Sequence, residues 1–200
     1  MKLSGKVGRI ARPVYTLNLE ADREQIGEEL SKWRIVSTAS NPTVAVSQAV
    51  IGFGNNDGTT FNFPPLAPLS NCRVECEMRI IDDGGDASRW AGIRVRAFLY
   101  DIRFGYLVYM RRTGTVELYR AGEVLGGANK PIVSDTKDEW THIRIDIFNT
   151  HIWVFVNGKQ HLHVTDTKFR DKDSVCLHTF GTHAQFRNLR VLKLLRKPRK

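Results

Sequence analysis

Three carboxylates stand at alternate positions near the start of the chain, in the stretch Glu20–Glu24. On a strand, such residues point into one groove, where a pair ~5 Å apart can act as nucleophile and acid–base catalyst on a glycoside. Ile26, Leu30 and Trp33 follow at helical spacing, so residues 18–33 predict a short amphipathic helix. On a helix the three acids fan apart. We therefore interpret them as exposed acids at a helix start.

A second set of candidates consists of polar and aromatic side chains at outward positions of predicted strands. Binding of a sugar by a sheet needs flat rings for its C–H faces and planar hydrogen-bonding groups for its hydroxyls. The candidate carbohydrate-binding residues are Arg94, Arg96, His142, Arg144, Asp146, Trp153, Phe155 and His178.

Several of these aromatic and charged residues also have a structural interpretation. Trp153 and Phe155 would equally suit packing under a loop or a second sheet. If Trp153 binds ligand, Trp153→Ala should abolish binding at an unchanged melting temperature, whereas a large loss of stability would assign the ring to the core. Trp90 and Trp140 stand at strand starts, which favours core anchors. The charged candidates also fit cross-strand ion pairs.

Histidines and aspartates at other positions give weaker signals for a metal. His161 and His163 alternate on one strand with His151 nearby, but no cysteine or carboxylate accompanies them at ligand spacing, so we prefer solvated histidines. The acidic stretches at 82–86 and 166–173 match no calcium-loop spacing. They predict turn-forming aspartates.

The elements that must position these residues are short apolar-alternating runs separated by turn residues. Asn157-Gly158 tolerates the positive φ angles of a two-residue hairpin, so residues 141–165 predict an antiparallel meander. The pattern indicates an all-β chain folded as a two-sheet antiparallel β-sandwich, with one short helix near the N-terminus. The expected strands are 34–37, 43–46, 49–53, 72–81, 90–98, 106–112, 115–119, 141–148, 151–156, 160–165, 174–180 and 186–194, with a short one at 131–133 and a loop at 122–129.

The charge of the chain predicts how its domain is bounded. The net charge is +9, and the basic residues of 1–12 and 193–200, which contain no acid, account for all of it. We predict a basic arm at 1–17, one sandwich domain at 18–192 and a basic tail at 193–200. We interpret both ends as solvated tails, although their charge would also suit contact with an acidic surface.

Cysteine usage and apolar content bear on the compartment. Three cysteines form no regular framework, which fits a reducing environment. No apolar run is long enough to span a membrane, and the first residues lack the apolar core of a secretory signal. These features favour the cytoplasm.

One family resemblance rests on the order of motifs in the second half of the chain. Trp140 is followed by an I-x-I-x-I strand, an I-x-V-x-V strand, Asn157-Gly158 and a closing A-x-F-x-N-L-x-V strand from Ala184. This order resembles the concanavalin A-like lectin/glucanase superfamily, in particular its laminin G-like and 3-keto-disaccharide-hydrolase-like domains. The resemblance covers residues 33–192. It implies a jelly-roll sandwich with a curved sheet that often binds carbohydrate and sometimes holds calcium.

Three functions therefore stay open at this point. The preferred one is a non-catalytic, lectin-like module that binds a glycan or a glycosylated partner through one sheet face. The second is a glycoside hydrolase of the same fold, which would be favoured if Asp146 or Glu117 shared a groove with another carboxylate. The third is an interaction module whose basic tails contact an acidic partner. Calcium is the one cofactor that the resemblance implies.

Overall fold

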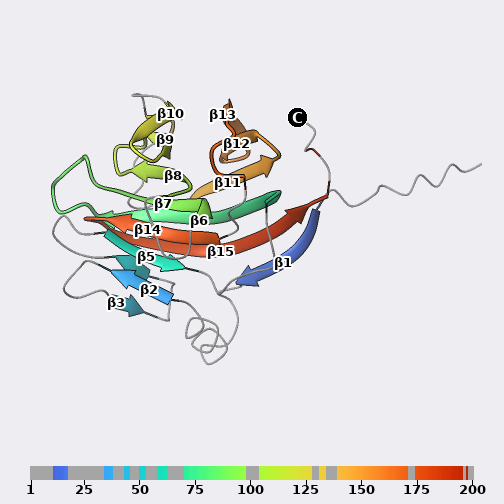
Figure 1. Ribbon diagram of the computed structural model, residues 1–200. Helices are drawn as coiled ribbons and strands as arrows, with labels where there is room; N and C mark the ends of the chain where they lie inside the picture. Colours follow the sequence, from blue (N-terminus) through green and yellow to red (C-terminus); the bar gives the residue numbers. More distant parts are fainter. Residues whose placement is uncertain are drawn as a thin grey trace, which may run out of the picture.

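The computed structural model describes residues 11–17, 34–37, 43–45, 50–52, 58–62, 70–97, 104–127, 131–133, 139–170, 174–195 and 197. The regular structure in these residues is all β-strand, arranged as two antiparallel sheets (Figure 1). The predicted all-β, two-sheet jelly-roll sandwich is confirmed. The predicted helix at 18–33 and the carboxylates of Glu20–Glu24 lie outside the described residues.

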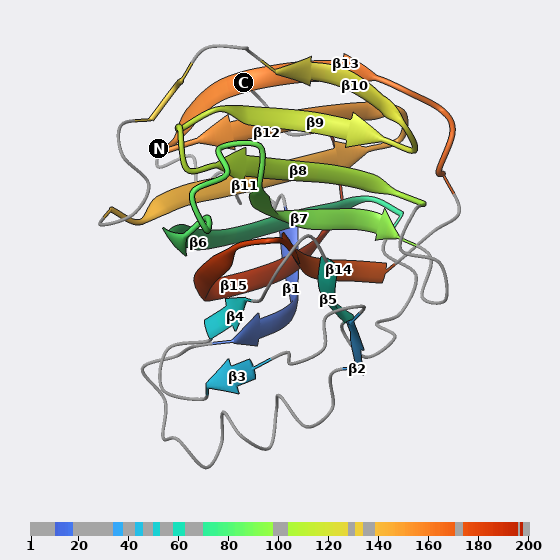
Figure 2. The same ribbon diagram turned by 90° about the vertical axis from the view of Figure 1, so that its left-hand side faces the viewer.

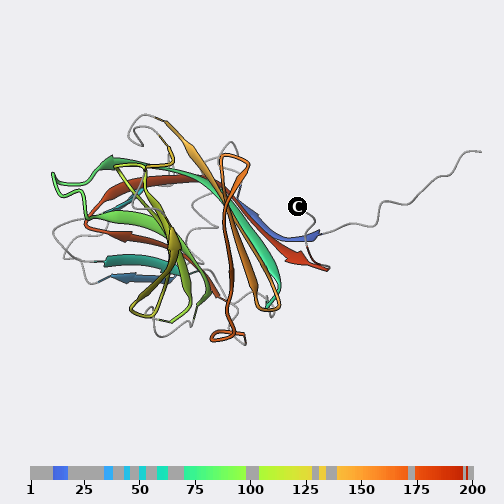
Figure 3. The ribbon, with the colours of Figure 1, turned by 90° about the horizontal axis from the view of Figure 1, so that it is seen from above.

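The two sheets form separate layers when the molecule is seen from above (Figure 3). Sheet A contains, in spatial order, β13 (Lys159–Thr165), β12 (His151–Val156), β11 (Thr141–Phe148), β6 (Cys72–Asp82), β15 (His183–Leu194), β4 (Val50–Gly52) and β3 (Thr43–Ala45), and β1 (Ala11–Leu17) also pairs with β15. Sheet B contains, in spatial order, β10 (Glu123–Gly127), β9 (Val116–Arg120), β8 (Tyr106–Arg111), β7 (Trp90–Ala97), β14 (Ser174–Phe180), β5 (Gly58–Asn62) and β2 (Arg34–Ser37). Each sheet therefore has an inner face toward the other sheet and an outer face.

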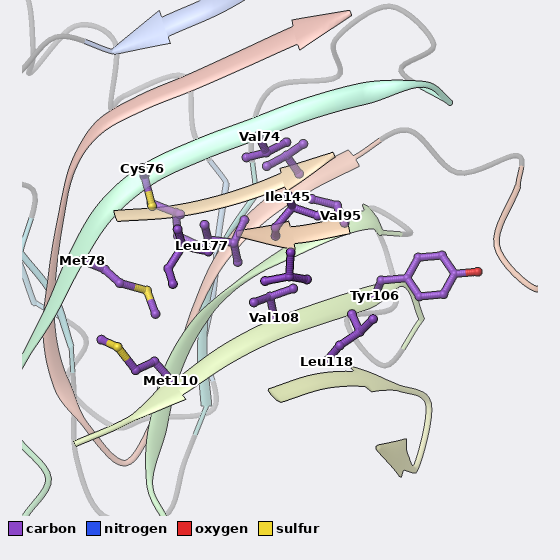
Figure 4. Close-up of a cluster of buried hydrophobic side chains, with 14 of the residues drawn as sticks. Val74, Cys76, Met78, Val95, Tyr106, Val108, Met110, Leu118, Ile145 and Leu177 are labelled. Atoms are coloured by element: carbon purple, nitrogen blue, oxygen red, sulfur yellow. The ribbon is translucent and has the colours of Figure 1, made fainter. Parts of the chain in front are cut away.

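Strict alternation of residue types explains why the strands lie between a core and an outer face. In β6 every second residue, from Cys72 to Ile80, is at most 1% exposed, while the charged residues between them are only half-buried. The side chains of alternate positions point to opposite faces of a sheet, so the apolar set fills the space between the layers. Figure 4 shows Met78 of β6 and Met110 of β8 pointing into this space from opposite sheets.

The hairpins that the sequence predicts are present in sheet A. Asn149, Asn157 and Gly158 have φ angles of 53°, 48° and 80°, the left-handed values that the two turns require. The turns connect β11 to β12 and β12 to β13, with registers such as Ile145 opposite Val154. The predicted meander is therefore confirmed.

Four segments differ from the sequence-based expectation. The predicted loop at 122–129 contains β10, which pairs with β9, whereas the predicted strand at 131–133 is not regular structure. Residues 11–17, expected in a basic arm, form β1 along the C-terminal half of β15. Residues 58–62, where no strand was expected, form β5, which pairs with β14 and β2. Short turn-rich segments carry little periodicity, so backbone pairing decides these cases.

All three cysteines are free and buried, which makes their reactivity a test of the fold. Burial raises the pKa of Cys72 and of Cys176 to about 12, and it also raises the pKa of Cys76. The thiolate is the reactive form, so we expect no thiol of the folded protein to react with a disulfide reagent at pH 8. The denatured protein should release three equivalents. A single fast-reacting thiol in the folded protein would contradict this packing.

Candidate functional site

Seven of the eight candidate residues divide between the two outer faces of the sandwich. Arg94 and His178 belong to β7 and β14 of sheet B. The five candidates on β11 and β12 belong to sheet A. Arg96, the remaining one, points away from Arg94. The structure therefore brings Arg94 and His178 together and separates them from the rest.

A cavity of about 600 Å³ opens on the outer face of sheet B. Strands β7, β8 and β9, which run side by side in Figure 2, supply most of its wall, together with β14. Its lining residues are Trp90, Arg94, Phe104, Leu107, Tyr109, Tyr119, Ala121, Gly122, His178 and Phe180. A concave, ring-lined space with a few polar groups is the usual form of a small-molecule site.

The strand register arranges these side chains in rows across the sheet. Directly opposed residues of antiparallel strands point to the same face, so each row contains one residue from each strand. The first row is Phe180, Trp90 and Arg111; the second is His178, Gly92, Tyr109 and Glu117; the third is Cys176, Arg94, Leu107 and Tyr119. Successive rows are two residues apart along the strands, roughly 7 Å.

One wall of the cavity is a group of aromatic rings around Trp90. The rings of Trp90 and Phe180 stack with centroids 5.6 Å apart and an interplanar angle of 18°. Tyr109 lies 5.2 Å from the same indole in a tilted arrangement, and His178 lies 4.8 Å from it, edge-on. Trp90 thus lines a cavity, which corrects its interpretation as a core anchor. Trp90 is one residue from Ala91 and three from Ile93, both on the buried face, and this odd spacing is the signal in the sequence that would have placed it outward.

The middle row contains a glycine, Gly92, between His178 and Tyr109. A Cβ atom at Gly92 would lie 2.3 Å from the carbonyl oxygen of Val108 and 2.8 Å from Cα of Tyr109. No side chain fits at this position while β7 and β8 keep their pairing. Gly92 therefore allows the close approach of the two strands in the row that contains His178 and Tyr109.

The polar groups of the lining are Arg94, His178 and two tyrosines. Arg94 is 4% exposed and His178 6% exposed. Burial, and next the positive charge of Arg94, lower the pKa of His178 to about 3, so its imidazole is neutral at pH 7. Burial raises the pKa of Tyr109 to about 12, which keeps its hydroxyl protonated. The described lining thus offers a neutral imidazole and a protonated tyrosine hydroxyl as hydrogen-bonding groups, beside one guanidinium.

The neutral state of His178 predicts how stability responds to acid. A histidine whose pKa is about 3 in the folded chain and about 6.5 in the unfolded chain takes up its proton preferentially on unfolding. Stability is therefore retained above pH 6.5 and lost as the pH falls toward 3. From pH 7 to pH 5 this group alone should remove ~2 kcal/mol of unfolding free energy. We expect His178→Gln to weaken the pH dependence in urea titrations, and an unchanged slope would contradict the burial of a neutral imidazole.

Beside the cavity, a carboxylate is held by an arginine and a tyrosine. Nη1 of Arg111 donates to Oε2 of Glu117 at 2.7 Å, and Nη2 of Arg111 donates to the hydroxyl of Tyr109 at 3.3 Å. Glu117 is 5% exposed. Among the described residues that line the cavity there is no carboxylate, and Asp146 lies on the other sheet. The described lining of this cavity therefore does not form the two-carboxylate arrangement of glycoside hydrolases.

Arg96 is drawn away from the cavity by an irregularity in β7. Its φ angle is 47°, and the pairing of β7 with β14 shifts register between the partners of Arg94 and Ala97. Its guanidinium donates to the backbone carbonyls of Ser70 and Asn149, at 2.9 Å from Nε to Ser70 and 2.7 Å from Nη2 to Asn149. Arg96 thus ties β7 to the chain segments before β6 and after β11, and it does not join Arg94.

On sheet A, the charged candidates form ion pairs across the strands. Asp146 is fully buried and accepts two hydrogen bonds from Arg73 of β6, at 2.6 and 2.8 Å. The guanidinium of Arg144 lies 3.6 Å from the ring centre of Phe155, and its Nε is 3.6 Å from Asp146. His142 lies 3.9 Å from Glu75. This part of sheet A has the cross-strand pairing that the sequence also allowed.

Trp153 is covered by a pair of histidines. It is 4% exposed, and His163 lies parallel to it at 4.9 Å with an interplanar angle of 4°. Nδ1 of His151 and Nε2 of His163 are 3.1 Å apart, so the two imidazoles hydrogen-bond to each other over the indole. Nζ of Lys197 lies 5.7 Å from the same ring. Of the predicted basic tail, this described lysine therefore contacts the chain's own sheet A.

The aspartates of the described acidic turn at 82–86 make internal hydrogen bonds. Oδ1 of Asp82 and Oδ1 of Asp83 accept the amides of Gly84 and Gly85, and Arg112 also bonds to Asp83. Asp166 likewise accepts hydrogen bonds from Tyr106 and Arg120. Within the described residues no group of three or more His, Cys, Asp or Glu side chains is arranged to hold a metal. The same residues contain no helix of the length and apolar character that a membrane span needs.

The structure is a concanavalin A-like β-sandwich with a cavity on the outer face of one sheet. The chain belongs to the 3-keto-alpha-glucoside-1,2-lyase-like domain family, whose model matches residues 22–192. No curated protein matches the sequence.

Solved structures with the same fold have low sequence identity to this chain. A carbohydrate-binding module of Bacillus subtilis, CBM66, is 14% identical over 80% of this chain and 94% of its own, with a TM-score of 0.63. A Bacillus subtilis protein of unknown function with a galectin-like fold is 12% identical over 94% and 99%, with a TM-score of 0.70. The exoplasmic/lumenal domain of VIP36, in its Ca²⁺/Man-bound form, is 7% identical over 84% and 86%, with a TM-score of 0.63. At these identities the likeness shows the fold alone.

Proposed function

We propose that this chain is a non-catalytic carbohydrate-binding module and that the cavity on the outer face of sheet B is its binding site. The observation that carries the proposal is the combination of a ring wall and polar groups in one cavity. The Trp90–Phe180 pair offers a flat apolar surface for the C–H face of a pyranose. Arg94, His178 and the tyrosine hydroxyls lie within the same cavity to hydrogen-bond the sugar hydroxyls.

The names of structures with this fold support a glycan as the ligand class. One is a carbohydrate binding module, one is the carbohydrate recognition domain of Emp46p, and one holds mannose and calcium. The partner that we propose is therefore a glycan or a glycosylated molecule.

A second candidate, catalysis, follows from the family description. A lyase that acts on a 3-keto-α-glucoside must remove a proton next to the keto group, so it needs a base in its site. In the described lining, Tyr109 keeps its proton and His178 has a pKa of about 3, so neither is a good base at neutral pH. Binding without catalysis is therefore our first choice. Release of the aglycone from a 3-keto-α-glucoside by the purified protein would favour catalysis over binding alone.

The experiment that tests the proposed function is a glycan array at moderate salt, run once with calcium and once with a chelator. We expect a saturable signal on one class of sugar. We also expect no loss of signal in chelator, because the described acidic turn at 82–86 is occupied by internal hydrogen bonds. Silence under both conditions would contradict the proposed function, and a signal seen only with calcium would show that residues outside the described part hold the ion.

A further inference from the structure

The cavity on sheet B differs in character from one end to the other. Its first and second rows contain the Trp90–Phe180 stack, His178 and Tyr109. They adjoin the Arg111–Glu117 ion pair, so this end combines rings with hydrogen-bonding groups. We call it the ring end.

The opposite end of the cavity is mostly apolar. Leu107 and Tyr119 of the third row are followed by Phe104, Ala121 and Gly122, and Arg94 is the one charged side chain of the lining there. Phe104 is 39% exposed, although large apolar side chains in this part of the chain are mostly buried. Val124 of β10, opposite Tyr119, is 51% exposed and extends the apolar row toward the sheet edge. We call this the Phe104 end.

The length of the cavity separates the two ends by more than one sugar ring. Trp90 and Arg94 are four residues apart on β7, which corresponds to about 13 Å along a strand. A single pyranose stacked on Trp90 would therefore leave the Phe104 end in contact with water. Exposed apolar side chains that gather at one place commonly mark a binding surface.

We infer that the site binds a glycoside with an apolar aglycone, an aryl or short alkyl group, rather than a free sugar or an unsubstituted polar glycan. The sugar lies at the ring end and the aglycone lies at the Phe104 end, between Phe104, Leu107 and Tyr119. This inference rests on the proposed function, since it assigns the second half of the same cavity. No bond is made or broken in this binding.

The test compares matched ligands by isothermal titration calorimetry on the full chain. The probes are the methyl, n-hexyl and phenyl glycosides of glucose, galactose and mannose, in both anomeric forms, with 1-hexanol and phenol as sugar-free controls. We expect the hexyl or phenyl glycoside of at least one sugar to bind at least tenfold more tightly than its methyl glycoside. Tenfold corresponds to 1.4 kcal/mol, which burial of about two methylene groups supplies.

Two matched variants locate the aglycone. Phe104→Ser should remove most of the tenfold advantage, so that the hexyl or phenyl glycoside binds about as tightly as the methyl glycoside. Ile132→Ser is the control, because Ile132 is 37% exposed, close to the 39% of Phe104, and does not line the cavity. It should retain the full advantage. Thermal unfolding of both variants checks that the fold is kept, since Phe104 also contacts Phe169 at 6.0 Å.

The outcomes separate this inference from the proposed function. Equal affinity for methyl, hexyl and phenyl glycosides would overturn the inference and leave carbohydrate binding intact. An advantage that persists in Phe104→Ser would overturn the assignment of the Phe104 end. Hexanol or phenol binding as tightly as the corresponding glycoside, or no binding of any glycoside, would overturn the proposed function as well.

Discussion

Trp90→Ala is expected to weaken carbohydrate binding at least 100-fold while the protein stays folded. The substitution removes the ring that stacks on Phe180 and contacts Tyr109 and His178, so the cavity loses its flat wall. A 100-fold loss equals ~2.7 kcal/mol, which is reasonable for a large aromatic anchor at the centre of a site. Titration calorimetry with the glycan that gives the strongest array signal measures the loss of affinity. Retained affinity would contradict binding in this cavity.

Trp153→Ala on sheet A is the matched control. Trp153 is 4% exposed under His151 and His163, so its removal should lower the unfolding free energy by ~3 kcal/mol. Carbohydrate affinity of the folded fraction should be unchanged, because this ring lies on the opposite outer face. The two interpretations that the sequence left open for Trp153 are separated by this pair of variants. Loss of binding without loss of stability would place the ligand on sheet A.

Asp146→Ala is expected to cost ~3–5 kcal/mol of unfolding free energy. Asp146 is fully buried, and the loss of its carboxylate would leave the guanidinium of Arg73 without its two hydrogen bonds. The same change removes the carboxylate that faces Arg144. Removing the buried partner of such an ion pair is strongly destabilising. Urea titration of the variant gives the value directly.

Arg190→Ala provides the comparison on the same face of sheet A. It breaks a 3.0 Å ion pair with Glu75, but the side chain of Arg190 is 50% exposed. Exposed ion pairs contribute at most about 1 kcal/mol to the unfolding free energy, so we expect Arg190→Ala to lower it by no more than that. If both variants lower the unfolding free energy by the same amount, the burial of Asp146 does not explain the strength of its ion pair. Sugar binding should be unchanged in both.

The sequence predicted the sandwich because its strongest signals are local. Asn157-Gly158 specifies a hairpin by its backbone angles, and the alternation of β6 specifies which side chains enter the core. Strand β10 was missed because it lies at a sheet edge, where few side chains are buried and pairing with β9 decides its conformation. The expectations of a reducing compartment and of tail contacts with acidic surfaces stay predictions.

The site was only half predicted because it depends on register between distant strands. Alternation indicated that Arg94 and His178 point outward, but it could not show that β7 and β14 are neighbours, separated by about 80 residues of chain. It also could not reveal the positive φ angle that turns Arg96 away. The same alternation, applied from Arg94 back to Trp90, would have placed the indole outward, but its position at a strand start favoured a core anchor.

The most direct test of the central claim is a two-dimensional NMR titration of protein labelled with ¹⁵N in the indoles of its four tryptophans. The probe ligand is the glycan with the strongest array signal. We predict that the Trp90 indole signal, assigned by its absence in Trp90→Ala, shifts with saturation while the signals of Trp140 and Trp153 stay in place. A saturable shift at Trp153 with Trp90 unaffected would contradict binding in the cavity of sheet B.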